Sequence, residues 1–130
     1  MNTLNPINIK AIDAFDFLSK KVNSHIIDTR SDLEWKTTGI PDLSSINKDT
    51  NLINWGPVLD QTFFEQYKKF LLISFNQNDS LFFICRSGSR SLMAAKCAIK
   101  FGFKNCFNIF DGFDNENDQN WKKNLPVKII

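Results

Sequence analysis

Residues 81–95 read LFFICRSGSRSLMAA, and they decide how the rest of this 130-residue chain is interpreted. The apolar run from Leu81 to Ile84 predicts a buried strand, which ends at Cys85. A short polar loop with one glycine and two arginines follows, and an alanine-rich helical stretch comes after it. The unpaired N–H groups and the positive dipole end of a helix favour a thiolate, and so do nearby arginines. The stretch therefore predicts a reactive sulfur at Cys85.

A cysteine at the end of a buried strand also has a purely structural interpretation, because free cysteine usually packs as a small hydrophobic side chain. A cysteine chosen only for packing has no need of Arg86 and Arg90 within the next five residues. We therefore favour the reactive thiol.

Strands and helices alternate along the chain. Apolar residues three apart predict a first helix at 9–18, and Ser31 with Glu34 predicts the capped start of a short second helix. Such alternation predicts an α/β fold with a central parallel sheet covered by helices on both faces. Because ligands bind at the carboxyl ends of parallel strands, we expect Cys85 and Asp28 at the functional edge. The remaining expected elements are strands at 25–28, 51–54, 81–84 and 106–109 and helices at 61–75 and 89–101.

The composition is that of an ordinary folded domain. The chain is 42% hydrophobic, and its formal net charge of +2 is too small to indicate nucleic-acid or membrane binding. No apolar run reaches membrane-spanning length, and residues 1–6 lack the basic and apolar pattern of a signal peptide. Three cysteines without a framework spacing do not suggest disulfides. We expect one domain over residues 1–130 in a reducing cytoplasm, without nucleic-acid or membrane partners.

The six residues from Cys85 to Arg90, followed by Ser91, resemble the active-site loop of the rhodanese family of sulfurtransferases. In that family a cysteine opens a loop that closes on arginine or threonine at the sixth position and runs into a helix. The resemblance implies a single rhodanese-like domain with a parallel sheet of about five strands. It covers nearly the whole chain through four further segments, which are Ile26–Trp35, Thr38–Asp42, Asn108–Phe113 and Trp121 with Leu125-Pro126.

The resemblance implies nucleophilic sulfur transfer. The Cys85 thiolate would take a sulfane sulfur from a donor such as thiosulfate, form a persulfide, and pass the sulfur to cyanide or a thiol. Such a covalent intermediate predicts ping-pong kinetics. No metal or organic cofactor is required.

The loop residues have separate expected roles. Backbone N–H groups of residues 86–91 would converge on the sulfur, and Gly88 would supply the positive φ that a tight cradle needs. Arg86 is expected to bind the anionic donor, and Arg90 is expected to anchor the loop on a carboxylate. The serines of the loop, Ser87, Ser89 and Ser91, complete the expected cradle.

Asp28, Arg30 and Glu34 admit two interpretations. In the first, Asp28 lies beside the loop and orients it, while Arg30 adds positive charge near the donor. In the second, Asp28 satisfies nearby backbone groups and Arg30 pairs with Glu34 at helical spacing. We favour the structural interpretation for Glu34, and both stay open for Arg30.

Several other residues have structural interpretations. His25, the only histidine, is expected at the beginning of its strand, far from Cys85, so no Cys–His pair is predicted. Cys97 and Cys106 are expected in the core, with a relay role as the minor alternative for Cys106. Trp55 either borders the active-site mouth or packs in the core.

The chain departs from the family pattern in two places. Gly39 takes the position of a histidine that often precedes Ile-Pro, which affects local hydrogen bonding. The acidic, amide-rich segment 114–120 replaces a regular helix, and it is either a mobile loop near the site or a solvated turn.

Three alternative functions fit the same residues. A persulfide carrier in a sulfur relay would use the same chemistry with a protein partner. A fold-related phosphatase would direct the thiolate at a phosphate ester, but its loop is one residue longer, and a phosphoryl group needs a wider cradle. A rhodanese-like module that only binds partners commonly lacks the cysteine, whereas this chain has Cys85.

Overall fold

The structure is a computed structural model that describes residues 5–130. Four of the six residues examined for a signal peptide, 1–4, lie outside the described part. The elements in chain order are β1 (Ile7–Ile9), α1 (Ala11–Lys20), β2 (Ser24–Asp28), α2 (Asp32–Thr38), β3 (Ile40–Pro41), a 3₁₀ turn (Ser44–Ile46), β4 (Thr50–Leu52), α3 (Gln61–Ser74), β5 (Ser80–Ile84), α4 (Ser89–Lys100), β6 (Asn105–Ile109), α5 (Trp121–Asn124) and β7 (Val127–Lys128).

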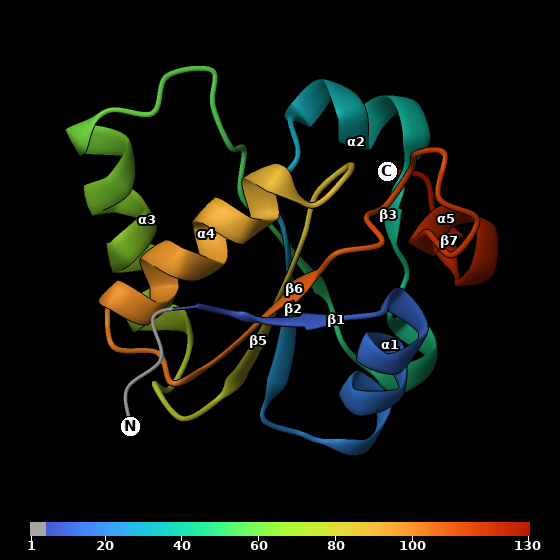
Figure 1. The fold of residues 1–130 in the computed structure, drawn as a ribbon, viewed down its shortest axis with the longest axis horizontal. Coiled ribbons are helices and arrows are strands. Elements are labelled where there is room, and N and C mark those ends of the chain that lie inside the picture. Colours follow the sequence, from blue (N-terminus) through green and yellow to red (C-terminus); the bar gives the residue numbers. More distant parts are fainter. Residues whose placement is uncertain (1–4) are drawn as a thin grey trace.

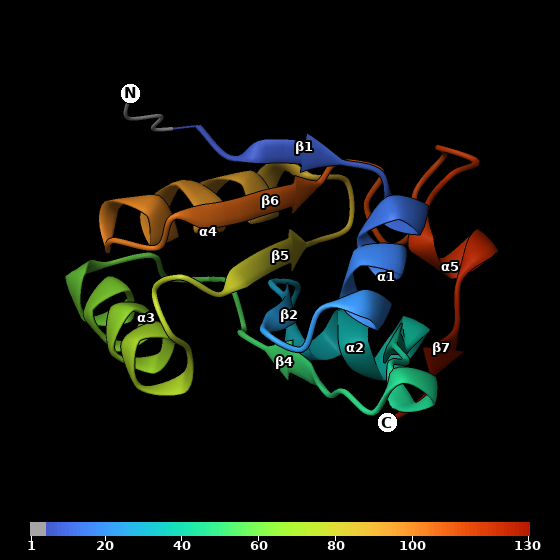
Figure 2. The same ribbon diagram turned by 90° about the horizontal axis from the view of Figure 1, so that it is seen from below.

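A five-stranded parallel sheet forms the centre of the domain (Figure 1). Its strands follow one another in the order β1-β6-β5-β2-β4 (Figure 2). The position of β5 in the middle of the sheet explains why its residues from Leu81 to Ile84 are all apolar. Leu81 and Phe83 belong to one hydrophobic core, and Phe82 and Ile84 belong to the other. Successive side chains of a strand point to opposite faces, so a strand buried on both faces needs apolar residues throughout.

Helices cover both faces of the sheet, as the sequence predicts. Figure 2 shows α3 and α4 on one side and α1 and α5 on the other. Tyr67 and Leu71 of α3 join the first core, while Ala14 and Leu18 of α1 join the second. The predicted single α/β domain with a five-stranded parallel sheet is confirmed.

The beginning of the chain differs from the sequence-based expectation. We expected Ile9 in the first helix, but it ends β1 and lies opposite Ile109 of β6, and α1 starts at Ala11. A three-residue edge strand is too short to show an alternating pattern, so helical spacing misassigned its last residue. Ile40–Pro41, for which no strand was expected, also forms a short strand, which pairs antiparallel with β7.

The parallel register brings the functional candidates to one edge. Asp28 lies opposite Ile84, so the residues that follow β2 and β5 emerge side by side. His25 lies near the other end of β2, where its Nε2 is 3.0 Å from Asp79 Oδ2. The expectation that His25 cannot pair with Cys85 is therefore confirmed. Within residues 5–130, none of the helices is both long and apolar enough to cross a bilayer.

Candidate active site

Cys85 follows the central strand and is held from both neighbouring strands. The N–H and hydroxyl of Thr29, after β2, both donate to the Ile84 carbonyl, at 2.8 and 3.1 Å. The N–H of Phe113, after β6, donates to the Cys85 carbonyl at 2.8 Å. Cys85 itself is only 1% exposed. The backbone around the sulfur is therefore fixed by the sheet rather than by a free loop.

The loop after Cys85 directs a backbone donor at the sulfur. Gly88, the residue that caps α4, has φ +102°, and its N–H donates to Cys85 Sγ at 3.1 Å. A Cβ at this position would also lie 3.3 Å from the Phe110 carbonyl oxygen. The positive φ expected at Gly88 is confirmed, and it places the N-terminus of α4 against the sulfur.

Ser91 and Asn108 form a buried polar pair beside the same sulfur. The Ser91 Oγ is 3.3 Å from Cys85 Sγ and 2.6 Å from Asn108 Oδ1. The Asn108 Nδ2 donates to the Gly88 carbonyl at 3.2 Å. Both side chains are nearly inaccessible to solvent. One side of the Cys85 sulfur therefore faces a continuous chain of hydrogen bonds, which runs from the Ser91 hydroxyl through the Asn108 carboxamide to the Gly88 carbonyl.

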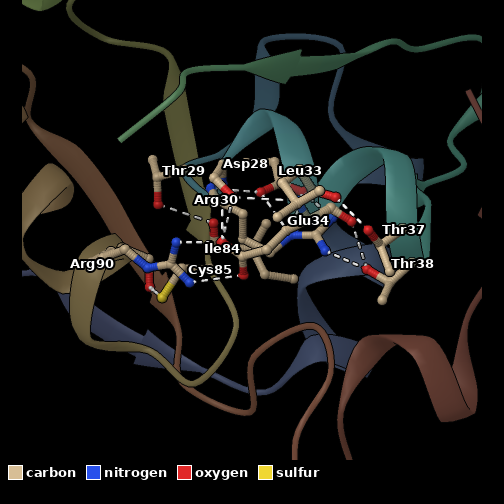
Figure 3. A network of polar contacts seen from close by, with 12 residues as sticks. Asp28, Thr29, Arg30, Leu33, Glu34, Thr37, Thr38, Ile84, Cys85 and Arg90 are labelled. Carbon is tan, nitrogen blue, oxygen red and sulfur yellow. Dashed lines mark hydrogen bonds and ion pairs between the residues drawn. The ribbon is translucent and has the colours of Figure 1, made fainter. Parts of the chain in front are cut away.

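Arg90 anchors the loop on a carboxylate, as the sequence predicts, and the carboxylate is Glu34 of α2. Two bonds join them, Nη1 to Oε1 at 2.6 Å and Nη2 to Oε2 at 3.0 Å. The Arg90 guanidinium, aided by donors of Ser31, lowers the pKa of the Glu34 carboxyl to about 2. The same hydrogen bond raises the pKa of Arg90, and the nearby Cys85 sulfur adds to that effect. Figure 3 shows this network of polar contacts.

Glu34 also caps its own helix. The Ser31 side chain accepts from the Glu34 N–H at 3.2 Å, and Glu34 Oε1 accepts from the Ser31 N–H at 3.1 Å. The expected capped helix start is confirmed. The interpretation that paired Arg30 with Glu34 is wrong, because Glu34 faces α4 instead.

Arg30 is a buried residue whose partner is Asp28. Its Nη2 lies 2.8 Å from Asp28 Oδ2 and 2.8 Å from the Gly39 carbonyl oxygen, and its Nη1 donates to Thr38 at 2.9 Å. The guanidinium carbon is 3.8 Å from the centre of the Phe113 ring. Arg30 is 1% exposed and Asp28 is fully buried. The pair ties the end of β2 to the end of α2, and its supporting role in the site stays a prediction.

The outer face of the loop borders an open pocket. Arg86 and Ser87 are exposed and line one side of a space of about 410 Å³. Asn115 of the amide-rich segment donates to the Arg86 carbonyl at 2.7 Å and to the Asp111 carbonyl at 2.8 Å. Segment 114–120 therefore contacts the active-site loop directly. The remaining lining residues are Phe110, Asp111, Glu116 and Asn117.

Gly112 lets the segment after β6 approach the loop. Its φ is +75°, and a Cβ there would overlap the Arg86 carbonyl oxygen. The hydrogen bond from Phe113 to the Cys85 carbonyl depends on the same close approach. A side chain at residue 112 would push the two backbone segments apart.

The other two cysteines lie away from the loop. Cys106 is 3% exposed, and burial raises the pKa of its thiol to about 12. Burial also raises the pKa of the half-buried Cys97 thiol. Trp55 packs edge-on against Phe63 and Tyr67 in the core, so its packing interpretation is confirmed. In residues 5–130, no group of three or more His, Cys, Asp or Glu side chains is arranged as a metal site.

Sequence reasoning missed one residue of the site, Asn108, which bonds both Ser91 and Gly88. A polar residue within the apolar run 106–109, near the carboxyl end of the strand, is the signal that could have identified it. Buried polar groups need partners, and in a parallel sheet those partners lie where ligands bind. In the parallel pairing of β5 with β6, Asn108 lies opposite Phe83, and Phe83 precedes Cys85 by two residues.

Comparison with known proteins agrees with this geometry. The family model of the rhodanese-like domain matches residues 12–118. The chain belongs to the rhodanese-like domain family. The uncharacterized protein RP600 of Rickettsia prowazekii is 38% identical over 121 residues, which are 92% of this chain and 94% of that protein. The adenylyltransferase and sulfurtransferase UBA4 of Debaryomyces hansenii is 31% identical over 112 residues, which are 85% of this chain but 22% of that protein.

Two solved structures resemble the domain in fold. The crystal structure of Rv0390 from M. tuberculosis has a TM-score of 0.78 and 27% identity, over 95% of this chain and 98% of that one. The polysulfide-sulfur transferase homodimer of Wolinella succinogenes has a TM-score of 0.67 and 19% identity, over 96% and 80% of the two chains. The second likeness concerns the fold alone.

Proposed function

We propose that this rhodanese-like domain is a sulfurtransferase that moves a sulfane sulfur from a donor such as thiosulfate to a thiophilic acceptor through a Cys85 persulfide. The observation that carries the proposal is the position of the Cys85 sulfur. It lies at the N-terminus of α4, 3.1 Å from the Gly88 N–H, in a six-residue loop closed by the Arg90–Glu34 pair. This arrangement favours a sulfur that carries negative charge.

The reaction has two displacement steps. The Cys85 thiolate attacks the outer sulfur of thiosulfate, a new S–S bond forms, and sulfite leaves with the electron pair of the broken S–S bond. The terminal sulfur of the persulfide then carries the negative charge. Cyanide or a thiolate acceptor attacks that sulfur, the S–S bond breaks, and the Cys85 thiolate is regenerated.

The loop residues would divide the work of binding. Arg86 is exposed beside the open pocket, so its guanidinium is available for an anionic donor. Arg90 is committed to Glu34, so it would hold the loop in shape and add positive charge near the sulfur. The backbone N–H groups of residues 86–91, that of Gly88 first, would stabilise the terminal sulfur of the persulfide.

A persulfide carrier in a sulfur relay is the second candidate. The similarity to the adenylyltransferase and sulfurtransferase of Debaryomyces hansenii favours it, because this chain matches only a part of that larger protein. In such a relay a protein thiol would replace cyanide as the acceptor. The same Cys85 persulfide serves both candidates, and they differ only in which acceptor removes the sulfur fastest.

Intact-mass measurement after incubation with thiosulfate tests the proposal. The wild-type protein is expected to gain the mass of one sulfur atom, and Cys85→Ser is expected to gain none. Cys97→Ser and Cys106→Ser serve as matched controls and are expected to keep the adduct, because burial raises the pKa of both thiols and so disfavours their reactive thiolate forms. An undiminished adduct in Cys85→Ser contradicts the assignment.

A pair of activity assays separates sulfur transfer from phosphate chemistry. We expect thiosulfate:cyanide transfer that depends on Cys85 and negligible hydrolysis of aryl phosphates, because a loop of six residues is too small for a phosphoryl transition state. Robust phosphatase turnover that Cys85→Ser abolishes, without sulfur transfer, would replace the sulfurtransferase assignment with the phosphatase. A loaded persulfide that a protein thiol empties much faster than cyanide identifies the relay carrier.

A further inference from the structure

Asn108 is a buried polar residue that no step of the reaction uses directly. It lies on β6, is 4% exposed, and bonds both residues that contact the Cys85 sulfur, Gly88 and Ser91. Its side chain bonds the Ser91 hydroxyl at 2.6 Å and the Gly88 carbonyl at 3.2 Å. Its carboxamide therefore joins Ser91, whose hydroxyl contacts the sulfur, to Gly88, whose N–H contacts the sulfur.

The orientation of the Asn108 carboxamide follows from its partners. The Gly88 carbonyl can only accept a hydrogen bond, so the amide nitrogen must face it and the amide oxygen must face Ser91. The reversed amide would place two oxygens against each other in a buried site. The acceptor side of Asn108 is thus directed at the Ser91 hydroxyl.

The Ser91 hydroxyl has one proton and two neighbours that could receive it. Asn108 Oδ1 is 2.6 Å away, a strong O–H···O distance, whereas Cys85 Sγ is 3.3 Å away. We propose that Asn108 is a positioning residue that holds the Ser91 proton away from the sulfur, so that Ser91 accepts a hydrogen bond from the Cys85 thiol instead of donating one to the thiolate. The proposed hydrogen-bond arrangement does not depend on the proposed function, but its consequence for the reaction rests on the proposed sulfur transfer.

That consequence is a preference for the loaded protein. In the free thiolate the negative charge is on Cys85 Sγ, which faces a lone pair of the Ser91 oxygen. In the persulfide the charge moves to the terminal sulfur, and Sγ becomes a neutral disulfide-type atom. Asn108 therefore disfavours the free thiolate and leaves the persulfide unaffected, which promotes sulfur loading over release of the empty thiolate.

Other charges around the sulfur act equally in the wild type and in the variants below. They come from the loop, from α4, from α2 and from the segments after β2 and β6. The charged residues involved are Arg86, Arg90, Glu34, Asp28, Arg30 and Asp111. None of them is changed in the experiment, so a difference between variants reports on the Ser91–Asn108 pair.

The test is the pH dependence of iodoacetamide alkylation at Cys85, followed by mass spectrometry of the Cys85 peptide. Ser91→Ala removes the oxygen that accepts from the thiol, so its alkylation midpoint is expected to fall by about half a pH unit to one unit. A midpoint that rises in Ser91→Ala overturns the proposal, because the hydroxyl would then be a donor to the thiolate. This measurement needs no sulfur donor, so it is independent of whether the protein transfers sulfur.

A double-mutant cycle separates the proton from simple loosening of the loop. Asn108→Ala frees the Ser91 proton for the thiolate and also releases the Gly88 carbonyl, whereas in the Ser91→Ala background only the second effect is left. Asn108→Ala is therefore expected to move the alkylation midpoint further toward low pH when Ser91 is present than in the Ser91→Ala background. The expected difference between the two shifts is about half a pH unit or more. Equal changes in the two backgrounds overturn the proposal.

Asn105→Ala is the matched control on the same strand. Asn105 also makes one hydrogen bond from its amide to a carbonyl, that of Asn78 at 2.9 Å, but at the far end of β6. Its alkylation midpoint is expected to equal that of the wild type. Should Asn108→Ala fail to fold, the direction of the Ser91→Ala shift still decides the question.

Discussion

Arg90 and Glu34 lie 56 positions apart in the chain and form a bidentate ion pair that closes the active-site loop, with hydrogen bonds of 2.6 and 3.0 Å. The same carboxylate completes the cap of α2 through Ser31. One side chain thus secures both the start of α2 and the start of α4. The loop that holds Cys85 cannot move as a whole without also disturbing the first turn of α2.

The Arg90–Glu34 pair makes the free energy of unfolding depend on pH in the acid range. The pKa of Glu34 is lowered in the folded protein to about 2, from 4.5. Its contribution is therefore complete above about pH 4.5 and disappears as the pH falls toward 2. We expect Glu34→Gln to be less stable than the wild type by about 1 kcal/mol at pH 6, a value reduced by the partial exposure of the pair. Urea unfolding at pH 6 and pH 2.5 should show the difference shrinking in acid.

Asp32→Asn is the control for this measurement. Asp32 lies in the same helix and pairs with Lys36 at 2.9 Å, but both side chains are more than half exposed. An exposed pair at this spacing contributes at most a few tenths of a kcal/mol. A stability loss in Asp32→Asn as large as that in Glu34→Gln would mean that the Arg90 contact has no special weight.

Arg90→Lys should impair sulfur transfer more than its retained charge suggests. A lysine ammonium cannot reproduce two parallel bonds to Glu34, so the loop loses its fixed geometry. We expect kcat/KM for thiosulfate to fall about tenfold or more, equivalent to the loss of one charged hydrogen bond. Lys96→Ala, further along α4, should leave the value unchanged. An active Arg90→Lys with normal kinetics would show that positive charge alone is sufficient.

Gly88→Ala should affect the site, and Gly56→Ala should affect only the backbone. Both glycines have φ near +100°, so each substitution strains the chain by about 1–2 kcal/mol. The Gly88 Cβ would also press on the Phe110 carbonyl and displace the N–H that points at the sulfur, whereas a Cβ at Gly56 meets nothing within 4 Å. We expect similar losses of thermal stability, with sulfur transfer strongly reduced only in Gly88→Ala. Equal activity losses would argue against a local role of the Gly88 N–H.

Asn115→Ala tests the contact between the amide-rich segment and the loop. Its amide holds the carbonyl of Arg86, the residue proposed to bind the donor. Loss of that bond should raise KM for thiosulfate about threefold to tenfold, with a smaller change in kcat. Gln119→Ala, an exposed change in the same segment, is the control. An unchanged KM in Asn115→Ala would limit this segment to a structural role.

Much of the domain can be predicted from short windows of sequence. The uniformly apolar Leu81–Ile84 run, the Ser31–Glu34 cap and the Gly88 turn are local patterns, and each has the predicted conformation. The main error, at Ile9, arose where three strand residues adjoin a helix and the two periodicities overlap.

The partners of the site residues were decided only by the tertiary structure. The sequence by itself determined that Cys85 stands between a buried strand and a helix N-terminus, because those preferences depend on neighbouring residues. It could not determine that Glu34 faces Arg90 rather than Arg30, or that Asn108 reaches Ser91. Those contacts join strand ends and helix starts from distant segments, and they form only when the parallel register brings these segments to the same edge of the sheet.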